Sequence, residues 1–124
     1  MHESGENYLE TILILKKRKG EVRSVDIAEE LGYSKASISR ALGILKDNDY
    51  VVVGSGGRIE FTEKGQETAE AIYERHCLIG RFLQYALDLD YETADRDACR
   101  IEHIISPETF ERIKSYVQKA QAAR

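Results

Sequence analysis

The chain of 124 residues lacks the features that mark several large classes of protein. Its two cysteines, Cys77 and Cys99, are too few for the disulfide framework of a small secreted domain, and no Cys-x-x-Cys pair indicates a structural zinc site. No apolar run is long enough to cross a bilayer, and no signal peptide opens the chain. We therefore expect a reduced, soluble, cytoplasmic protein with no membrane contact.

Excess positive charge is also absent. Eighteen Lys and Arg against 22 Asp and Glu give a net charge of −4, which excludes a globally basic nucleic-acid binder. The distribution is uneven, however, because residues 33–46 contain Lys35, Arg40 and Lys46 and no acid. The pattern therefore indicates one local basic segment between acidic flanks.

Apolar periodicity predicts a mainly α fold with a modest core. The expected helices are 5–19, 25–31, 35–47, 63–87, 91–105 and a last helix that starts at Pro107. A β-branched run, 50–53, and an alternating run, 58–61, flank a Gly-Ser-Gly-Gly turn and predict a hairpin. We place the domain boundary where the long helix begins, which gives units of residues 1–62 and 63–124.

The helices at 25–31 and 35–47 form a predicted helix-turn-helix. Ser24 and Ser34 are the expected caps, and only Gly-Tyr-Ser joins the two helices. An ordinary helical hairpin fits this pair equally well, but the β-hairpin that follows favours a winged helix-turn-helix. Small and cationic side chains at the start of its second helix suit the major groove. The DNA-contacting candidates are Ser34, Lys35, Ala36, Ser37, Ser39 and Arg40.

Arg58 lies at the base of the predicted wing. It could contact a phosphate or merely solubilise the hairpin, and the sequence does not separate these two roles.

Three potential metal ligands share one helical face near the C-terminus. Cys99, Glu102 and His103 have the i, i+3, i+4 spacing that brings side chains together on a helix. A thiol, a carboxylate and an imidazole form a transition-metal donor set of mixed softness. The alternative is a solvated acidic helix face with a packed cysteine. It does not explain why a cysteine, a glutamate and a histidine occur together on this face.

Other polar residues have simpler interpretations from the sequence alone. Asn7 and Glu10 lie three apart on the first predicted helix, where exposed polar residues are ordinary. His76, in the middle of the long helix, is more often structural than a ligand. The C-terminal helices are too few to bury their apolar faces alone, so we expect a symmetric homodimer.

Together these motifs resemble the diphtheria toxin repressor family of metal-dependent transcriptional regulators, which includes manganese transport regulators. The resemblance covers essentially the whole chain. It rests on Asn-Tyr-Leu-Glu-Thr-Ile (7–12), Asp-Ile-Ala-Glu-Glu-Leu (26–31), Thr-Glu-Lys-Gly (62–65), Glu-Arg-His (74–76) before Phe-Leu, and above all Ala-Cys-Arg-Ile-Glu-His-Ile-Ile-Ser (98–106). It implies an N-terminal winged helix-turn-helix and a C-terminal helical domain for metal binding and dimerisation. The third, SH3-like domain of larger members is not expected here.

Carried over position by position, the resemblance implies the metal ligands Asn7, Glu10, His76, Cys99, Glu102 and His103. Residue 7 is Met in iron-type members and Asp in manganese-type members, whereas Cys99 matches the iron type and Glu10 the manganese type. An iron-type ancillary site built on His76 would need an acid and a second His where this chain has Gly80 and Asp95. The ancillary site is therefore expected to be broken, which leaves His76 for a merged site.

The expected function is a DNA-binding transcriptional repressor of metal homeostasis genes, with Fe(II) or Mn(II) as corepressor and a slight preference for Fe(II). Co(II), Ni(II) or Zn(II) could substitute in the site. The expected partners are double-stranded DNA with a palindromic operator and a second copy of the chain. Two alternatives stay open: a winged-helix regulator with a vestigial metal site, and a small metalloenzyme. The second is disfavoured because the ligands supply no substrate pocket, general base or nucleophile.

Overall fold

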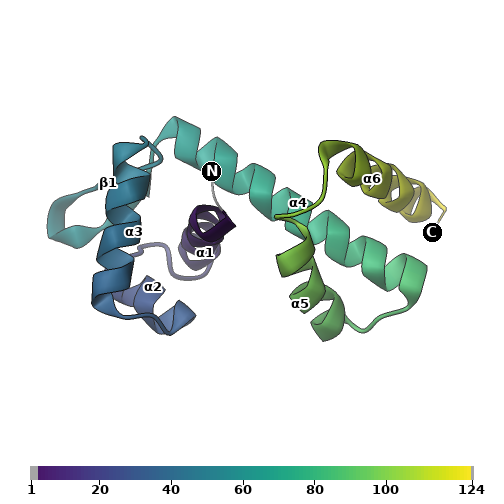
Figure 1. Cartoon of the computed structure of the whole chain (residues 1–124), viewed down its shortest axis with the longest axis horizontal. Coiled ribbons are helices and arrows are strands. Elements are labelled where there is room, and N and C mark those ends of the chain that lie inside the picture. The colour runs from purple at the N-terminus through teal and green to yellow at the C-terminus, as the bar shows by residue number, and fades with distance from the viewer. Residues whose placement is uncertain (1–2, 124) are drawn as a thin grey trace. The chain divides into compact units, whose positions relative to one another are not determined.

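The computed structural model describes residues 3–123, which form six α-helices and one two-stranded sheet (Figure 1). The chain divides into two compact units, one up to Glu70 and one from Ala71 onward. The division falls inside the long helix α4 (Glu63–Leu87). Each unit has its own buried apolar residues, and each is described by itself.

The first unit is a winged helix-turn-helix, as predicted. It consists of α1 (Glu3–Lys19), α2 (Ser24–Leu31), α3 (Lys35–Asp47), β1 (Val51–Val53), a 3₁₀ turn (Ser55–Gly57), β2 (Ile59–Phe61) and the start of α4. Its core is made of aliphatic side chains at helical spacing on the three helices, with one inward residue from each strand. These buried residues are Leu9, Ile12, Leu13, Ile27, Ile38, Leu42, Leu45, Val51 and Ile59.

The turn between α2 and α3 follows the sequence signals. Gly32 has a left-handed φ of 70°, and its N–H donates to the Ala28 carbonyl at 2.8 Å. Ser34 then caps α3, because its hydroxyl accepts a hydrogen bond from the Ser37 N–H at 3.2 Å. This short, well-defined turn fixes where α3 begins.

The predicted cap of α2 was wrong. Ser24 is the first helical residue, and Arg23 is the N-cap with an extended backbone. Asp26, in the first turn of the helix, makes the reciprocal contact of a capping box: its carboxylate accepts the N–H of the N-cap residue Arg23 at 2.8 Å and pairs with Lys19 Nζ at 2.6 Å. Both hydrogen bonds lower the pKa of Asp26, and the one from Lys19 has the larger effect.

Each predicted strand is shorter by its first residue, and the wing is tied to the rest of the first unit. β1 and β2 pair antiparallel with Val51 opposite Phe61 and Val53 opposite Ile59. The Ile59 N–H also donates to the Val22 carbonyl at 2.8 Å, and Lys16 Nζ lies 2.9 Å from Glu60 Oε2. These contacts join β2 to α1 and to the segment that follows it.

Gly65 is the glycine of the Thr-Glu-Lys-Gly motif, and its position has no room for a side chain. A Cβ atom at this position would lie 1.8 Å from the backbone oxygen of Tyr50. The helix start approaches the wing this closely because Thr62 Oγ1 accepts the Gly65 N–H at 3.0 Å and donates to the Asp49 carbonyl at 2.6 Å. Any other residue would push α4 away from the wing.

The second unit packs the remainder of α4 against α5 (Tyr91–Ile101) and α6 (Pro107–Ala122). Asp90 caps α5 through the Thr93 N–H at 2.7 Å, and Ser106 caps α6 through the Thr109 N–H at 3.1 Å. The unit's buried core is Leu78, Ile79, Leu83, Ala94, Ala98, Ile113 and Val117.

The prediction that α5 continues to Ile105 was wrong, because the helix ends at Ile101. The backbone then tightens: the His103 N–H bonds the Arg100 carbonyl at 3.4 Å, and the Ile104 N–H bonds the Ile101 carbonyl at 3.0 Å. These i→i−3 hydrogen bonds are tighter than the i→i−4 bonds of an α-helix. They mark the end of α5 about one turn before the residue predicted from the sequence. Among residues 3–123, no helix is both long and apolar enough to cross a membrane.

Candidate metal centre and DNA interface

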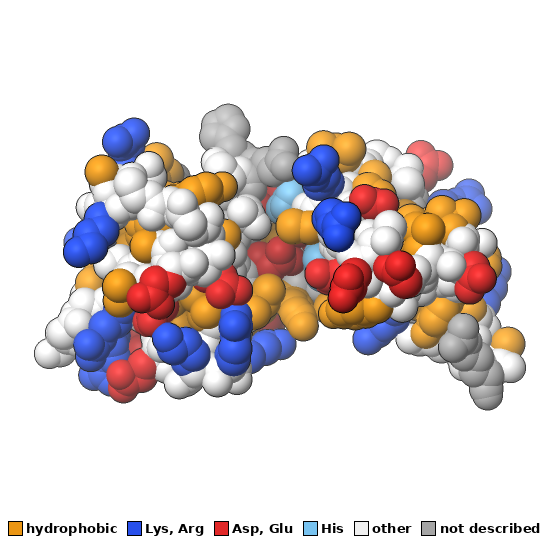
Figure 2. All heavy atoms as spheres, turned by 90° about the horizontal axis from the view of Figure 1, so that it is seen from below, with side chains coloured by type: hydrophobic (Ala, Val, Ile, Leu, Met, Phe, Trp, Pro, Cys, Tyr) orange, Lys and Arg blue, Asp and Glu red, His pale blue; other side chains and the backbone are white. Residues whose placement is uncertain are grey.

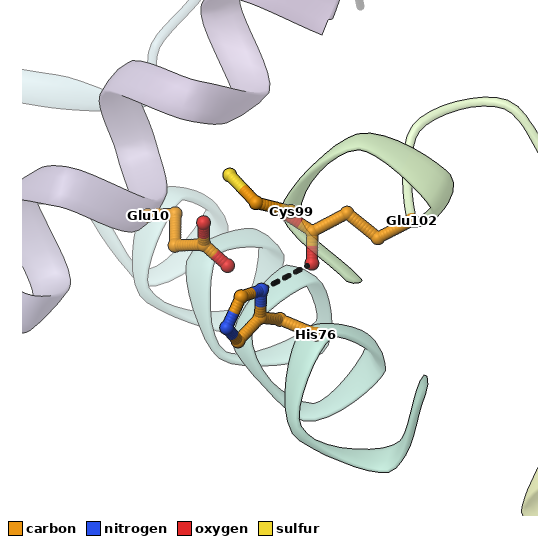
Figure 3. A group of neighbouring side chains, drawn as sticks. All are labelled: Glu10, His76, Cys99 and Glu102. Atoms are coloured by element: carbon orange, nitrogen blue, oxygen red, sulfur yellow. Dashed lines mark ion pairs between the residues drawn. The ribbon is translucent and has the colours of Figure 1, made fainter. Parts of the chain in front are cut away.

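Three of the predicted ligands come together within the second unit. His76 projects from the middle of α4, Cys99 from the last turn of α5, and Glu102 from the residue directly after α5. Their ligand atoms lie within 4.8 Å of one another. Figure 3 shows the Glu102 carboxylate pointing at the His76 ring, with the Cys99 sulfur nearby. The sequence places Cys99 and Glu102 on one face, and the packing of α4 on α5 adds His76.

Glu102 has the most unusual surroundings in this cluster. Its side chain is 0% exposed, and neither carboxylate oxygen has a hydrogen-bond partner among the described residues. Oε2 lies 3.2 Å from His76 Nδ1, and Oε1 lies 3.2 Å from His103 Nε2. A buried carboxylate is costly unless a cation or several donors compensate it. The imidazoles of His76 and His103, a type of side chain that can bind transition metals, are the groups beside it.

His103 lies beside Glu102 although α5 ends earlier than predicted. The Glu102 N–H still donates to the Ala98 carbonyl at 3.0 Å, so the chain stays helical in direction through that residue. The His103 side chain is 2% exposed and reaches Glu102. The early end of the helix therefore leaves His103 beside Glu102, whereas the group of ligand atoms within 4.8 Å of one another contains His76, Cys99 and Glu102 but not His103.

Asp95 is a polar neighbour of the cluster, although the family resemblance predicted it only as a lost ancillary ligand. Its Oδ1 lies 2.6 Å from His76 Nε2. The signal was present in the spacing, because Asp95, Cys99 and Glu102 are at i, i+4 and i+7 and thus share a helical face. The ring of His76 consequently has a carboxylate at each nitrogen.

Asn7 and Glu10 lie on α1 in the first unit. Glu10 is buried, with 4% of its surface exposed, so its interpretation as an ordinary exposed residue was wrong. Asn7 is half-buried, and its backbone carbonyl accepts the Thr11 hydroxyl at 2.8 Å. Their role as ligands stays a prediction.

The donors of the second unit fit a divalent transition metal. Bonds of about 2.0–2.3 Å to nitrogen, oxygen and sulfur place the ligands of one ion at most about 4.6 Å apart. The 4.8 Å limit on the separations of the three ligand atoms is close to this value. The buried Glu102 carboxylate, the His76 imidazole and the Cys99 thiol thus match both the reach and the chemistry of such an ion.

The predicted DNA-contacting residues lie at the start of α3. Ser34, Lys35, Ala36, Ser39 and Arg40 are exposed, whereas Ser37 is half-buried with its hydroxyl 3.0 Å from Ser34 Oγ. Ile38 on the opposite side is fully buried and anchors the helix. The N-terminal end of α3 therefore presents small, polar and cationic groups to solvent.

Arg58 has a protein partner. Its Nη1 lies 3.0 Å from Glu21 Oε1, and its side chain is 43% exposed. On the face seen in Figure 2, Lys and Arg side chains lie next to acidic ones. Lys16 and Glu60 form a second such pair in the first unit. A phosphate contact by Arg58 would have to compete with Glu21.

Comparison with protein families matches nearly the whole chain. Residues 1–56 match the N-terminal DNA binding domain of the iron dependent repressors. Residues 62–123 match the metal binding and dimerisation domain of the same proteins.

Individual relatives agree with this match. A helix-turn-helix transcriptional regulator of Methanocaldococcus jannaschii is 34% identical over 120 residues, which cover 96% of each chain. The transcriptional regulator MntR of Geobacillus kaustophilus is 33% identical over 118 residues, 95% of this chain and 83% of that one.

Solved structures share the fold. The manganese regulator SloR superposes with a TM-score of 0.79 at 28% identity over 92% of this chain and 53% of its own. A manganese-dependent transcriptional repressor in complex with manganese has a TM-score of 0.84 at 24% identity, over 92% of this chain and 52% of its own. The present chain thus spans about half the length of these solved proteins.

The metalloenzyme alternative is therefore wrong, because the matched family and the curated relatives of similar sequence are transcriptional regulators. With both family domains matched and the buried donor cluster in its second unit, the chain belongs to the iron-dependent repressor family of divalent-metal-dependent, DNA-binding transcriptional repressors that control metal homeostasis.

Proposed function

We propose that this protein represses metal homeostasis genes when Fe(II) or Mn(II) is bound by His76, Cys99, Glu102 and His103, with Asn7 and Glu10 completing the ligand set. The observation that carries the proposal is the fully buried Glu102 carboxylate between two imidazoles. Structural burial alone gives no reason for such an arrangement, since a similar apolar side chain would cost less.

The ligands explain why the cluster needs a cation. Cys99 binds as a thiolate and gives up its proton, and Glu102 and Glu10 bring further negative charge. The bound ion supplies the positive charge that offsets these groups. Without a cation, these negative charges repel one another.

Control of DNA binding follows from where the ligands lie in the sequence. Glu10 and Asn7 are on α1, which packs against α2 and α3 of the DNA-binding unit. In this proposal, one metal ion takes ligands from both units of each subunit. The two recognition helices of a dimer then have a defined spacing only when the metal is bound. A palindromic operator has half-sites about one or more helical turns apart, so this spacing sets affinity. The expected coupling is about 1–3 kcal/mol.

The second unit provides surface for the dimer. Leu87, Tyr91, Ile104 and Tyr116 are large apolar side chains, and each is at least 44% exposed. Burying such residues against a second copy is favourable. We assign DNA binding to residues 1–62 and metal binding with dimerisation to residues 63–124, in the cytoplasm.

The first test of the function is operator binding in the presence and absence of metal. In anaerobic gel-shift titrations, Fe(II) or Mn(II) should tighten operator binding by about 5–150-fold relative to chelator. Anaerobic conditions protect Cys99 from oxidation. Equal affinity with chelator and with every divalent metal tested would contradict the proposal and favour a vestigial metal site.

Arg40 gives a test of the DNA interface. Arg40→Ala should weaken operator binding by about 1–3 kcal/mol if Arg40 reads a base edge, or lower the salt slope by about 1 if it contacts a phosphate. Lys46→Ala is the matched control, because Lys46 is an exposed cation in the last turn of the same helix. Equal effects of the two substitutions in salt-dependent binding titrations would show that α3 does not enter DNA by its N-terminal end.

A further inference from the structure

The two nitrogens of His76 face carboxylates in different surroundings. Nδ1 lies 3.2 Å from Glu102 Oε2, in a side chain that is 0% exposed. Nε2 lies 2.6 Å from Asp95 Oδ1, in a side chain that is 47% exposed. One edge of the ring therefore faces the buried donor cluster, and the other faces a carboxylate that reaches solvent.

This arrangement decides which nitrogen can act as a ligand. A neutral imidazole has one N–H and one lone pair, and a metal binds the lone pair. The nearer carboxylate, Asp95 at 2.6 Å against 3.2 Å for Glu102, accepts the N–H and so keeps the proton on Nε2. With the proton on Nε2 beside Asp95, the lone pair of Nδ1 is directed at Glu102 and the cluster.

We propose that Asp95 is a positioning residue of the metal centre, which accepts the Nε2–H of His76 and thereby fixes Nδ1 as its metal-binding atom. The inference rests on the proposed metal site. It assigns Asp95 a supporting role in place of the ligand role that an ancillary site would give to its position. The 2.6 Å contact also fixes the orientation of the ring. Gly80, one helical turn after His76, has no side chain that could hold the ring in place of Asp95.

The test uses the full-length chain with ¹⁵N-labelled histidine and Cd(II) as a diamagnetic probe. In the wild type, the His76 resonances should show Cd(II) on Nδ1 and a proton on Nε2. Asp95→Ala should give mixed Nδ1 and Nε2 coordination and an affinity for Cd(II) about 10–100-fold weaker. Asp95→Asn should restore the single Nδ1-bound form, because its side-chain oxygen still accepts the N–H.

Asp97→Ala is the matched control, because Asp97 is an exposed acid on the same helix, only two residues after Asp95. It should leave the spectrum and the affinity unchanged, which separates the contact with His76 from loss of negative charge. Thermal unfolding of each variant without metal shows whether the fold is retained, and Asp95→Asn keeps the test valid if Asp95→Ala unfolds.

Three results would overturn the inference. Nδ1 coordination and affinity unchanged in Asp95→Ala would show that Asp95 does not position the ring, while the metal site itself would stand. Loss of one of two bound ions in Asp95→Ala would show that Asp95 is itself a ligand. No Cd(II) at His76 in the wild type would instead overturn the metal site and, with it, this role of Asp95.

Discussion

Glu102→Gln should abolish the effect of metal on operator binding. The substitution keeps the shape of the side chain but removes the charge of a carboxylate that is 0% exposed and lies 3.2 Å from each of two imidazoles. Loss of a residue that only supports a ligand costs about 10–100-fold in metal affinity, so loss of the ligand itself should cost at least about 100-fold. Isothermal titration with metal and anaerobic gel shifts measure both consequences.

The stability of the metal-free protein separates a metal site from a structural role for Glu102. A buried carboxylate is costly without a compensating cation, and a neutral amide of the same shape does not carry that cost. The metal-free Glu102→Gln protein should therefore unfold at a temperature no lower than the wild type. Glu92→Gln, on the exposed side of α5, is the control and should keep the full metal response. A Glu102→Gln protein that still responds to metal would favour a vestigial site.

Cys99→Glu should change which metal activates the protein. The Cys99 thiolate is the softest donor in the cluster and favours Fe(II), Co(II) and Zn(II), whereas a carboxylate favours Mn(II). We expect the ratio of Zn(II) to Mn(II) affinities to fall by on the order of tenfold or more. An anaerobic metal panel, read by operator binding and by metal titration, measures this ratio in both proteins.

Cys77→Ser is the control for the cysteine substitution. Cys77 is half-buried on α4 beside His76, but adjacent residues on a helix diverge by about 100°. Cys77→Ser should therefore leave the metal preference unchanged. If Cys99→Glu and the wild type had the same preference, Cys99 would not be a ligand, and metal selectivity would have to come from Glu10, Glu102 and Asn7.

Local sequence signals predicted most of the fold because they act over a few residues. Ser34 and Ser106 cap helices as expected, and Gly32 ends α2 with a left-handed backbone. The wrong assignments concern the start of α2 and the end of α5. Arg23 is the N-cap of α2 and donates its N–H to Asp26, and α5 ends at Ile101 although no residue there breaks a helix.

The candidate site was predictable to a different degree for each ligand. Cys99, Glu102 and His103 share a face through their spacing alone, so the helical repeat is enough to predict that they meet. His76 gave no such signal and entered only through the family resemblance. Asp95 was predicted as a lost ligand, and only the packing of α4 on α5 placed its carboxylate 2.6 Å from His76.

The helix-turn-helix, the hairpin and the face that carries three donors follow from the amino-acid sequence alone, because they depend on backbone propensity and on the fixed 3.6-residue repeat. What surrounds each donor follows only from tertiary packing. Burial and contact between α4 and α5 depend on side chains distant in the chain, and they leave Glu102 out of water between two imidazoles. They also give His76 a different carboxylate at each nitrogen.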